Sequence, residues 1–161
     1  MDFHAGDTVM HWTHGLGKVI RRERRDVLGT RALYYAIQVG EMTIWVPVDD
    51  NVRKRLRRTT PRVRFKRALT QLTKPGAMLP TDRHERKLLL SEYLKDSRVE
   101  SLVRIIRCLL DYRKQRSLNE NDQAVMHRVQ STLVEEWGYV MDVTPGEARI
   151  QLMQLIETAA A

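Results

Sequence analysis

The amino-acid sequence predicts an α+β protein in which a small β domain precedes a compact all-helical domain. The first 50 residues alternate polar and apolar positions and are rich in β-branched and aromatic side chains, as short strands usually are. After Pro47 the apolar residues take the three-and-four spacing of amphipathic helices. A strongly basic segment separates the two patterns. A chain of 161 residues can hold one or two such domains with modest cores.

The β-rich part is expected to fold as a small barrel, because its strands are short and its turns are tight. We expect an SH3/Tudor-like barrel in residues 1–50, a basic connecting segment with one helix in residues 51–80, and a helical domain in residues 81–161. The expected strands are Thr8–Trp12, Lys18–Val27, Ala32–Val39 and Met42–Val48. Glycine-containing turns separate them at His14-Gly15, Leu28-Gly29-Thr30 and Val39-Gly40-Glu41.

Capping signals mark the starts of the four or five helices that follow. An acceptor side chain before an apolar periodic run, often with an acid three residues later, favours a helix start. The signals are Thr60-Pro61, Asp82 with Glu85, Asp96-Ser97, Asn119 with Asp122, and Thr144-Pro145-Gly146-Glu147. The first of these helices is expected to span Arg62–Leu72. The second should reach about Tyr93, and Gly138 is a candidate for ending a later helix early.

The positive charge of the chain is concentrated in its middle. The formal net charge is +8, and residues 51–67 contain nine Lys or Arg residues without one Asp or Glu. Arginine forks match phosphate geometry, so this run predicts a nucleic-acid surface more than an anionic membrane, since no strongly apolar face opposes it. The competing interpretation is a solvated charged face. The residues expected to contact nucleic acid here are Arg53, Lys54, Arg55, Arg57, Arg58, Arg62 and Lys66.

Enzymatic and metal-binding motifs are not evident. The five histidines have no metal-ligand spacing with the single cysteine, Cys108, and no glycine-rich phosphate loop occurs. We therefore expect no catalytic residue, no metal site, no cofactor and no small-molecule substrate. A single cysteine fits a reducing cytoplasm. No apolar run is long enough to span a membrane, so no membrane association is expected.

The N-terminal motif resembles a known domain. It reads Phe3-x-x-Gly6-Asp7-Thr8-Val9, followed by His14-Gly15-x-Gly17-x-Val19, Tyr34-Tyr35 and Val46-Pro47-Val48. This pattern resembles the RNA polymerase-interacting domain of the CarD/CdnL family of bacterial transcription regulators, and a related module of transcription-repair coupling factors. The resemblance implies that an edge strand docks on the β subunit of RNA polymerase. Its expected contacts are Arg25, Ile44, Trp45, Val46 and Pro47, with Trp45 standing where a family member carries arginine.

A second stretch carries the resemblance into the helical part. Pro80-Thr81-Asp82-Arg83-His84-Glu85-Arg86-Lys87 is similar to the family's Pro-Thr-Asn-Trp-Ser-Arg-Arg-Tyr segment, whose tryptophan wedges into the minor groove of promoter DNA. By this alignment Arg83 replaces the tryptophan and Arg86 keeps a family arginine. Arginine favours a narrow minor groove without wedging. The expected DNA contacts are Arg83, Arg86 and Lys87. A protein that binds promoter DNA in this way is expected to be cytoplasmic and associated with the nucleoid.

Two other functions stay open at this stage. The first is a nucleic-acid-binding protein that acts without the polymerase through Arg53–Arg67. The second is an adaptor that binds peptides through its barrel, with a basic segment that only aids solubility. Arg107 in Ile105-Ile106-Arg107 and the Leu118-Asn119-x-x-Asp122 segment also match the family pattern, but these are packing and capping positions.

Overall fold

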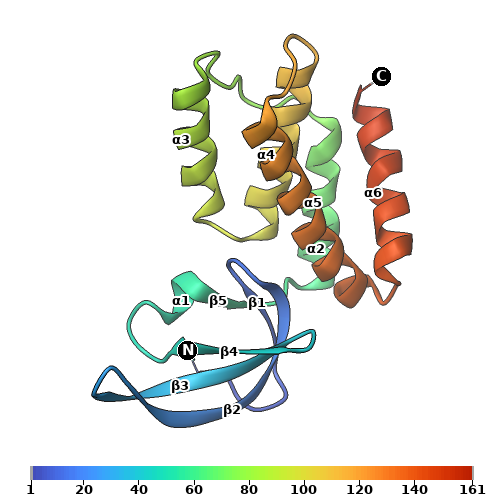
Figure 1. Cartoon of the computed structure of the whole chain (residues 1–161). Coiled ribbons are helices and arrows are strands. Elements are labelled where there is room, and N and C mark those ends of the chain that lie inside the picture. Colours follow the sequence, from blue (N-terminus) through green and yellow to red (C-terminus); the bar gives the residue numbers. More distant parts are fainter. Residues whose placement is uncertain (1, 161) are drawn as a thin grey trace. The chain divides into compact units, whose positions relative to one another are not determined.

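The fold was analysed in a computed structural model that describes residues 2–160 (Figure 1). The α+β class predicted from the sequence is confirmed, because an antiparallel sheet is followed by helices. The chain divides into two compact units at Thr59/Thr60, a β unit and a helical unit. The first part of the basic segment thus belongs to the β unit, and its last part to the helical unit.

The β unit contains five strands and one short helix. They are β1 Thr8–His11, β2 Gly15–Val27, β3 Thr30–Val39, β4 Met42–Pro47, α1 Val52–Arg55 and β5 Leu56–Arg58. All neighbouring strands are antiparallel, in the order β4-β3-β2-β1-β5. Within residues 2–160 the two edge strands, β4 and β5, do not pair with each other, so the predicted barrel is not closed. The sequence interpretation also missed α1 and β5, which lie inside the basic segment.

Two glycines of the N-terminal motif have distinct structural reasons. Gly15, which opens β2, has φ +79°, a left-handed conformation that costs side-chain-bearing residues energy. At Gly17 an added Cβ would lie 2.8 Å from Cγ2 of Ile37, so only glycine lets β2 approach β3 this closely. The core beside it contains Tyr35, whose hydroxyl accepts a hydrogen bond from the Phe3 backbone N–H at 3.1 Å. The motif therefore specifies how tightly the sheet packs.

A buried histidine organises the turn between β1 and β2. His11 is 9% exposed, and its Nδ1 accepts hydrogen bonds from the backbone N–H groups of Thr13 at 3.2 Å and His14 at 3.1 Å. Burial, helped by the nearby His14, lowers the pKa of His11 from 6.5 to about 4. The turn therefore requires the neutral imidazole, because a protonated Nδ1 cannot accept a hydrogen bond.

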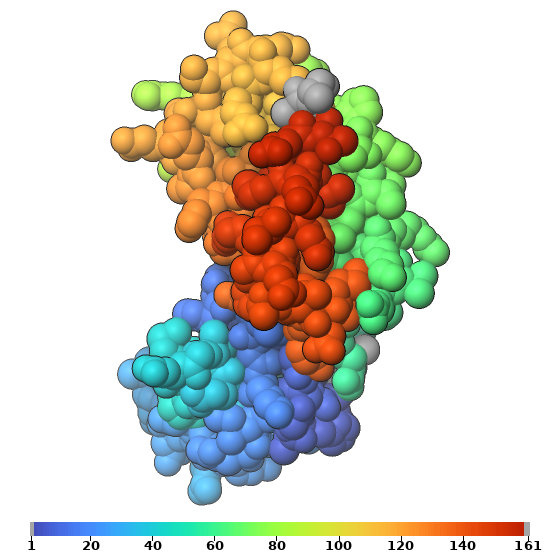
Figure 2. Space-filling model, turned by 90° about the vertical axis from the view of Figure 1, so that its right-hand side faces the viewer, coloured from blue at the N-terminus to red at the C-terminus, as the bar shows by residue number. Residues whose placement is uncertain are grey.

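The helical unit is built around one central helix. Its elements are α2 Arg62–Leu69, η1 Thr70–Thr73, α3 Arg83–Leu94, α4 Val99–Arg113, α5 Glu120–Met141 and α6 Pro145–Ala160. Helix α4 packs against α2, η1, α3 and α5, and ten of its residues are buried. Helix α6 covers α5 and η1, and Figure 2 shows it in red along one face with the green segment beside it.

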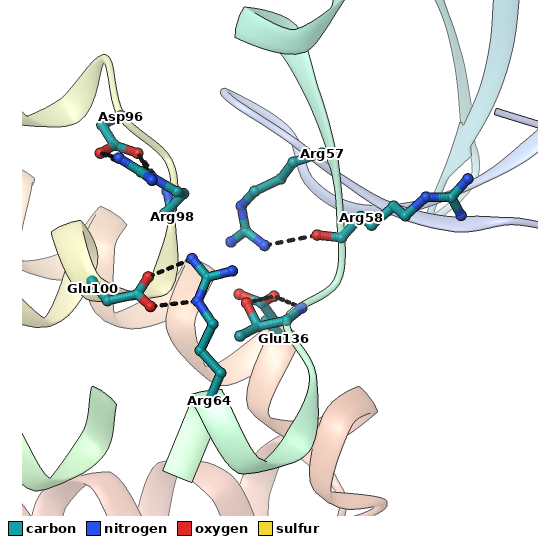
Figure 3. A network of polar contacts seen from close by, with 8 residues as sticks. Arg57, Arg58, Arg64, Asp96, Arg98, Glu100 and Glu136 are labelled. Atoms are coloured by element: carbon teal, nitrogen blue, oxygen red, sulfur yellow. Dashed lines mark hydrogen bonds and ion pairs between the residues drawn. The ribbon is translucent and has the colours of Figure 1, made fainter. Parts of the chain in front are cut away.

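Three of the five predicted helix caps are confirmed, at Asp82, Asn119 and Thr144, whose Oγ1 accepts a hydrogen bond from the Glu147 N–H at 3.1 Å. Asp82 accepts hydrogen bonds from the N–H groups of His84 and Glu85, and Asn119 forms a reciprocal capping box with Asp122. The other two predicted caps are wrong. Asp96-Ser97 does not cap α4, whose N-cap is Arg98 without a side-chain cap bond. Thr60 does not cap α2, whose N-cap is Pro61. The Thr60 backbone N–H and hydroxyl instead donate to Oε2 of the fully buried Glu136, both at 2.8 Å (Figure 3). Gly138 does not end α5, which continues to Met141.

The buried pair Arg86–Asp122 joins three helices of this unit. Nε of Arg86 donates to both Asp122 carboxylate oxygens, at 2.9 and 3.1 Å. Its NH1 donates to the carbonyls of Pro80 and Thr81 and to the hydroxyl of Tyr112, each within 3.1 Å. The hydrogen bond with Asp122 raises the pKa of Arg86, so the guanidinium stays charged. Residues of α3, α4 and α5 are thereby held by one cation.

Arg107 of α4 is a second buried arginine, as its match to a packing position predicts. It is 5% exposed and donates to the Leu72 carbonyl at 2.8 Å and to Asp111 at 2.9 Å. Asp111 also accepts a hydrogen bond from the Gly76 backbone N–H. The segment after η1 is thus attached to α4 through polar contacts rather than through regular structure.

Replacing Asp122 with alanine should lower the unfolding free energy of the helical unit more than replacing an exposed acid does. Asp122→Ala leaves the buried Arg86 guanidinium without its counter-ion, and such losses cost about 3–5 kcal/mol. We expect this drop in the unfolding free energy from urea titration followed by the helical circular-dichroism signal. Glu120→Ala, in the same first turn but exposed, is the matched control and should cost less than about 1 kcal/mol. Equal losses would contradict the role of the pair.

Acid should weaken the β unit through His11. The pKa of His11 is lower in the folded than in the unfolded state, so the unfolded chain binds the extra proton between about pH 6.5 and 4. Stability is therefore nearly complete above pH 6.5 and falls by about 3 kcal/mol as the pH drops to 4. His11→Asn should flatten this dependence of the unfolding midpoint, whereas the exposed His127→Asn should leave it intact. An unchanged slope in His11→Asn would refute the assignment.

Candidate protein and nucleic-acid interfaces

The edge strand β4 separates its side chains onto two faces. Val46 lies opposite Tyr35 of β3 and is 2% exposed, and Ile44 packs beside the same core. Trp45 lies opposite Ala36 and points to the other face, where it is 39% exposed. Of the five expected polymerase contacts, Ile44 and Val46 thus offer their backbone edge rather than their side chains. Pro47, which ends the strand, is half-buried.

Trp45 and Arg25, two residues expected to bind the polymerase, lie in contact on the outer face of the sheet. The Arg25 guanidinium carbon is 3.9 Å from the centroid of the Trp45 ring. The indole N–H of Trp45 donates to Glu23, and Glu23 also pairs with Arg21 at 3.0 Å and with Arg25 at 3.7 Å. We call Arg21, Glu23, Arg25 and Trp45 the outer-face cluster. It places an aromatic ring and two cations on one open surface.

The neighbours of Glu23 in the cluster favour the ionised form of its carboxyl group. The hydrogen bond from the Trp45 indole, then the one from Arg21, lowers the pKa of Glu23. Glu23 and Arg21 were not expected as site residues. Their every-second-residue spacing with Arg25 on an exposed strand is the signal that could have found them, because such residues share one face.

The β-unit part of the basic segment is only partly free for an outside anion. Arg53 and Lys54 on α1 are exposed. The other three cations have partners inside the β unit: Arg55 with Asp49 at 2.9 Å, Arg58 with Asp7 at 3.6 Å, and Arg57 with the Arg58 carbonyl at 3.1 Å. Intramolecular pairing reduces the charge that these three residues present to a phosphate.

Helix α2 presents an exposed basic face. Arg62 and Lys66 share this face and are joined by Arg67, while Phe65 is buried on the opposite side. Arg64 is occupied differently, since its guanidinium pairs with both carboxylate oxygens of Glu100 on α4 (Figure 3). The outward face of α2 therefore keeps three cations, and α2 itself contains no acid.

The three basic residues at the start of α3 that were expected to contact DNA, Arg83, Arg86 and Lys87, differ in their exposure to solvent. Arg83 and Lys87 are exposed, whereas Arg86 is 3% exposed and bonded to Asp122. Arg83, His84 and Lys87 line a shallow depression of about 460 Å³ together with residues 119–121 at the start of α5. The N-terminal ends of α3 and α5 thus face one hollow, where the helix dipoles and two cations attract a phosphate while the carboxylate of Glu120 repels it.

The part of the chain that the structure describes bears on three other features, namely metal sites, membrane-spanning helices and a reactive cysteine. Among residues 2–160 no group of three or more His, Cys, Asp or Glu side chains could hold a metal ion. Within the same range, no helix is long and apolar enough to cross a bilayer. Cys108 is buried in the helical core, and this burial raises the pKa of its thiol, which makes it a poor nucleophile.

Comparison with known proteins finds a family match for the β unit. Residues 3–60 match the CarD-like/TRCF RID domain, and this range includes β1 to β5 and the outer-face cluster. The chain is also 20% identical over 146 residues to the "Putative transcription factor YdeB" of Bacillus subtilis (strain 168), an alignment that covers 88% of this chain and 94% of that protein. The resemblance to the CarD/CdnL family that the sequence indicates is therefore confirmed, and it rests chiefly on the similarity of residues 3–60 to the CarD-like/TRCF RID domain.

Proposed function

We propose that this protein is a transcription regulator that binds the RNA polymerase β subunit through its β unit and promoter DNA through its helical unit. The observation that carries the proposal is the stacking of Arg25 on Trp45 inside the matched domain, on the outer face of an edge strand. The DNA contacts are supported by exposed cations at the start of α3 and on α2.

The polymerase contact has two components. Strand β4 is paired only with β3 in the observed sheet order, so its other edge can receive a strand of the partner through backbone hydrogen bonds. Beside that edge Trp45 supplies the rigid aromatic surface that is common at the centres of protein interfaces. Arg25 and Glu23 already hold the indole in place, so little side-chain freedom is lost on binding.

The DNA contact is electrostatic. Arg83 and Lys87 contact phosphates or a narrow minor groove beside the hollow at the starts of α3 and α5, and Arg62 and Lys66 add phosphate contacts from α2. In the β unit, Arg53 and Lys54 are the most accessible members of the basic run. Arg86 is left out of the interface because it is buried and its Nε and NH1 donate hydrogen bonds inside the helical unit. Arg55, Arg57 and Arg58 act mainly within the β unit.

Such a protein changes transcription by binding one state of the promoter better than another. Contacts that are stronger when the DNA strands are open than when they are closed shift this equilibrium toward the open complex. A difference of about 1.4 kcal/mol in binding changes the ratio of the two states roughly tenfold. Arg83 has no flat aromatic ring to insert between bases, so it acts by attraction to the backbone rather than by wedging.

A nucleic-acid-binding role without the polymerase is the second candidate. The observation that favours it is the basic outward face of α2, which contains Arg62, Lys66 and Arg67 and does not depend on the resemblance. Salt-sensitive DNA binding by a protein that shows no affinity for the polymerase would support it. A peptide-binding adaptor would instead bind DNA weakly, with no change on loss of Arg53–Arg58.

Substitutions in the outer-face cluster should weaken polymerase binding. Trp45→Ala removes the aromatic anchor and Arg25→Glu reverses the charge stacked on it, so each should raise the Kd for RNA polymerase at least about tenfold. The full-length chain is titrated against core polymerase by fluorescence anisotropy. Met42→Ala changes another exposed residue of β4 and should leave the Kd within about twofold. Wild-type affinity in both cluster variants would overturn the docking surface.

Removing the cations at the start of α3 should reduce the salt dependence of DNA binding. Each lost phosphate contact lowers the slope of log K against log salt by about 0.9. The double variant Arg83→Gln/Lys87→Gln should therefore lose about 1–2 from this slope on a short duplex. Lys95→Gln, at the other end of α3 and paired with Glu92 at 3.0 Å, should not change it. If all slopes are equal, DNA does not bind at this end of the helix.

A further inference from the structure

The β2–β3 hairpin extends past the strands that flank it. Strand β1 pairs with β2 only between Gly15 and Lys18, and the pairing of β4 with β3 ends where Pro47 meets Tyr34. The β2–β3 pairing continues to Val27 and Thr30. The Leu33 carbonyl still accepts a hydrogen bond from the Val48 N–H at 3.0 Å. Closer to the tip than Leu33, the hairpin is a ribbon of two strands that ends in a loop (Figure 1).

The turn at the tip of this ribbon contains a residue that suits it poorly. Leu28 has φ +52° and Gly29 has φ +80°, the two positive values that define a type I′ turn. Asparagine, aspartate or glycine is preferred at the first of these positions, because a left-handed conformation strains other side chains. Leu28 is also 100% exposed, so its side chain contributes nothing to the core. The fold would be better served by asparagine here.

A strained, fully exposed apolar residue is most simply explained by what it contacts outside its own chain. Local rules are usually broken at functional positions, and here turn chemistry and burial are broken by one side chain. Val27, the neighbouring residue, is itself 43% exposed, which adds to the apolar surface at the tip.

The charges along the ribbon indicate the chemistry of the partner. Five arginines lie on β2 and β3 near the tip, against only Glu23 and Asp26: Arg21, Arg22, Arg24, Arg25 and Arg31. Arg24 and Arg31 are exposed, whereas Arg21 and Arg25 lie around Glu23 in the outer-face cluster. An apolar tip surrounded by cations fits an apolar pocket with an acidic rim. Arg25 belongs both to this ribbon and to the cluster, whereas Arg24 and Arg31 lie on the other face of the ribbon, where Asp26 is opposite Arg31 in the strand register.

We propose that Leu28 is an anchor that inserts into an apolar, acid-rimmed pocket of the RNA polymerase β subunit, next to the site of the outer-face cluster. This inference rests on the proposed polymerase docking and extends it to the hairpin tip. The strain in the turn is retained because the leucine side chain is needed in the complex. Arg24 and Arg31 lie beside it and face the acidic rim.

The proposal makes stability and binding change in opposite directions. Leu28→Asn places the residue that a type I′ turn prefers at this position, so the melting temperature of the β unit should rise by a few degrees. The same substitution removes the anchor, so the Kd for core polymerase should increase about tenfold. Leu28→Met keeps an apolar side chain of similar volume and should bind within about twofold of wild type. A residue that served only the turn could not produce this pair of effects.

The full-length wild type, Leu28→Asn and Leu28→Met are titrated against core polymerase and, separately, against a short DNA duplex. Wild-type polymerase affinity in Leu28→Asn would overturn the anchor while leaving the docking of the outer-face cluster intact. Loss of affinity for the duplex, with polymerase binding unchanged, would also overturn it by assigning the tip to DNA. If wild type itself does not bind polymerase, both the anchor and the proposed function fail. If Trp45→Ala binds more weakly but Leu28→Asn binds like wild type, only the anchor is refuted.

Discussion

The contact between Arg86 and Asp122 determines how the helical unit presents its surface. One guanidinium ties α3 to α5, stacks on Tyr112 of α4 at 4.5 Å, and fixes the Pro80–Thr81 backbone just before α3. Asp122 also completes the capping box that starts α5. The beginnings of α3 and α5 are consequently held at one place, and the hollow lined by Arg83 and Lys87 lies there. The buried Arg86 thus helps to position the exposed Arg83 and Lys87.

The β unit relies on the alternation of a strand rather than on a buried ion pair. On β4 the residues on either side of Trp45 face the core, which leaves Trp45 on the opposite face with Arg25 and Glu23. The backbone edge of β4 that faces away from β3 is available for hydrogen bonds because β4 is an end strand in the observed sheet order. On the proposed docking, β4 would bind its partner through Trp45 and the strand backbone and pack the core through Val46, so a substitution of Val46 would test folding rather than recognition.

Much of the fold could be predicted because its signals are local. Four strands and most helix starts follow from alternation and from caps such as Asp82 and Asn119, whose partners lie within three residues. Strand β5 could not be found in this way, since three residues in a basic run have no periodicity and exist as a strand only through pairing with β1. The buried state of Arg86 was also missed, although its four-residue spacing from the buried Leu90 places both on one helix face.

The bond between Thr60 and Glu136 has a consequence for how weak contacts combine. Strand β5 ends at Arg58, and Thr60 is already fixed to α5, so Thr59 is the one residue between the last strand and the first anchored residue of the helical unit. If the protein binds polymerase and DNA as proposed, so short a connection makes the second binding event intramolecular, at an effective concentration that can reach the millimolar range. On that proposal, the contacts of single cations with DNA can each be weak and short-lived, because binding to the polymerase keeps the DNA nearby.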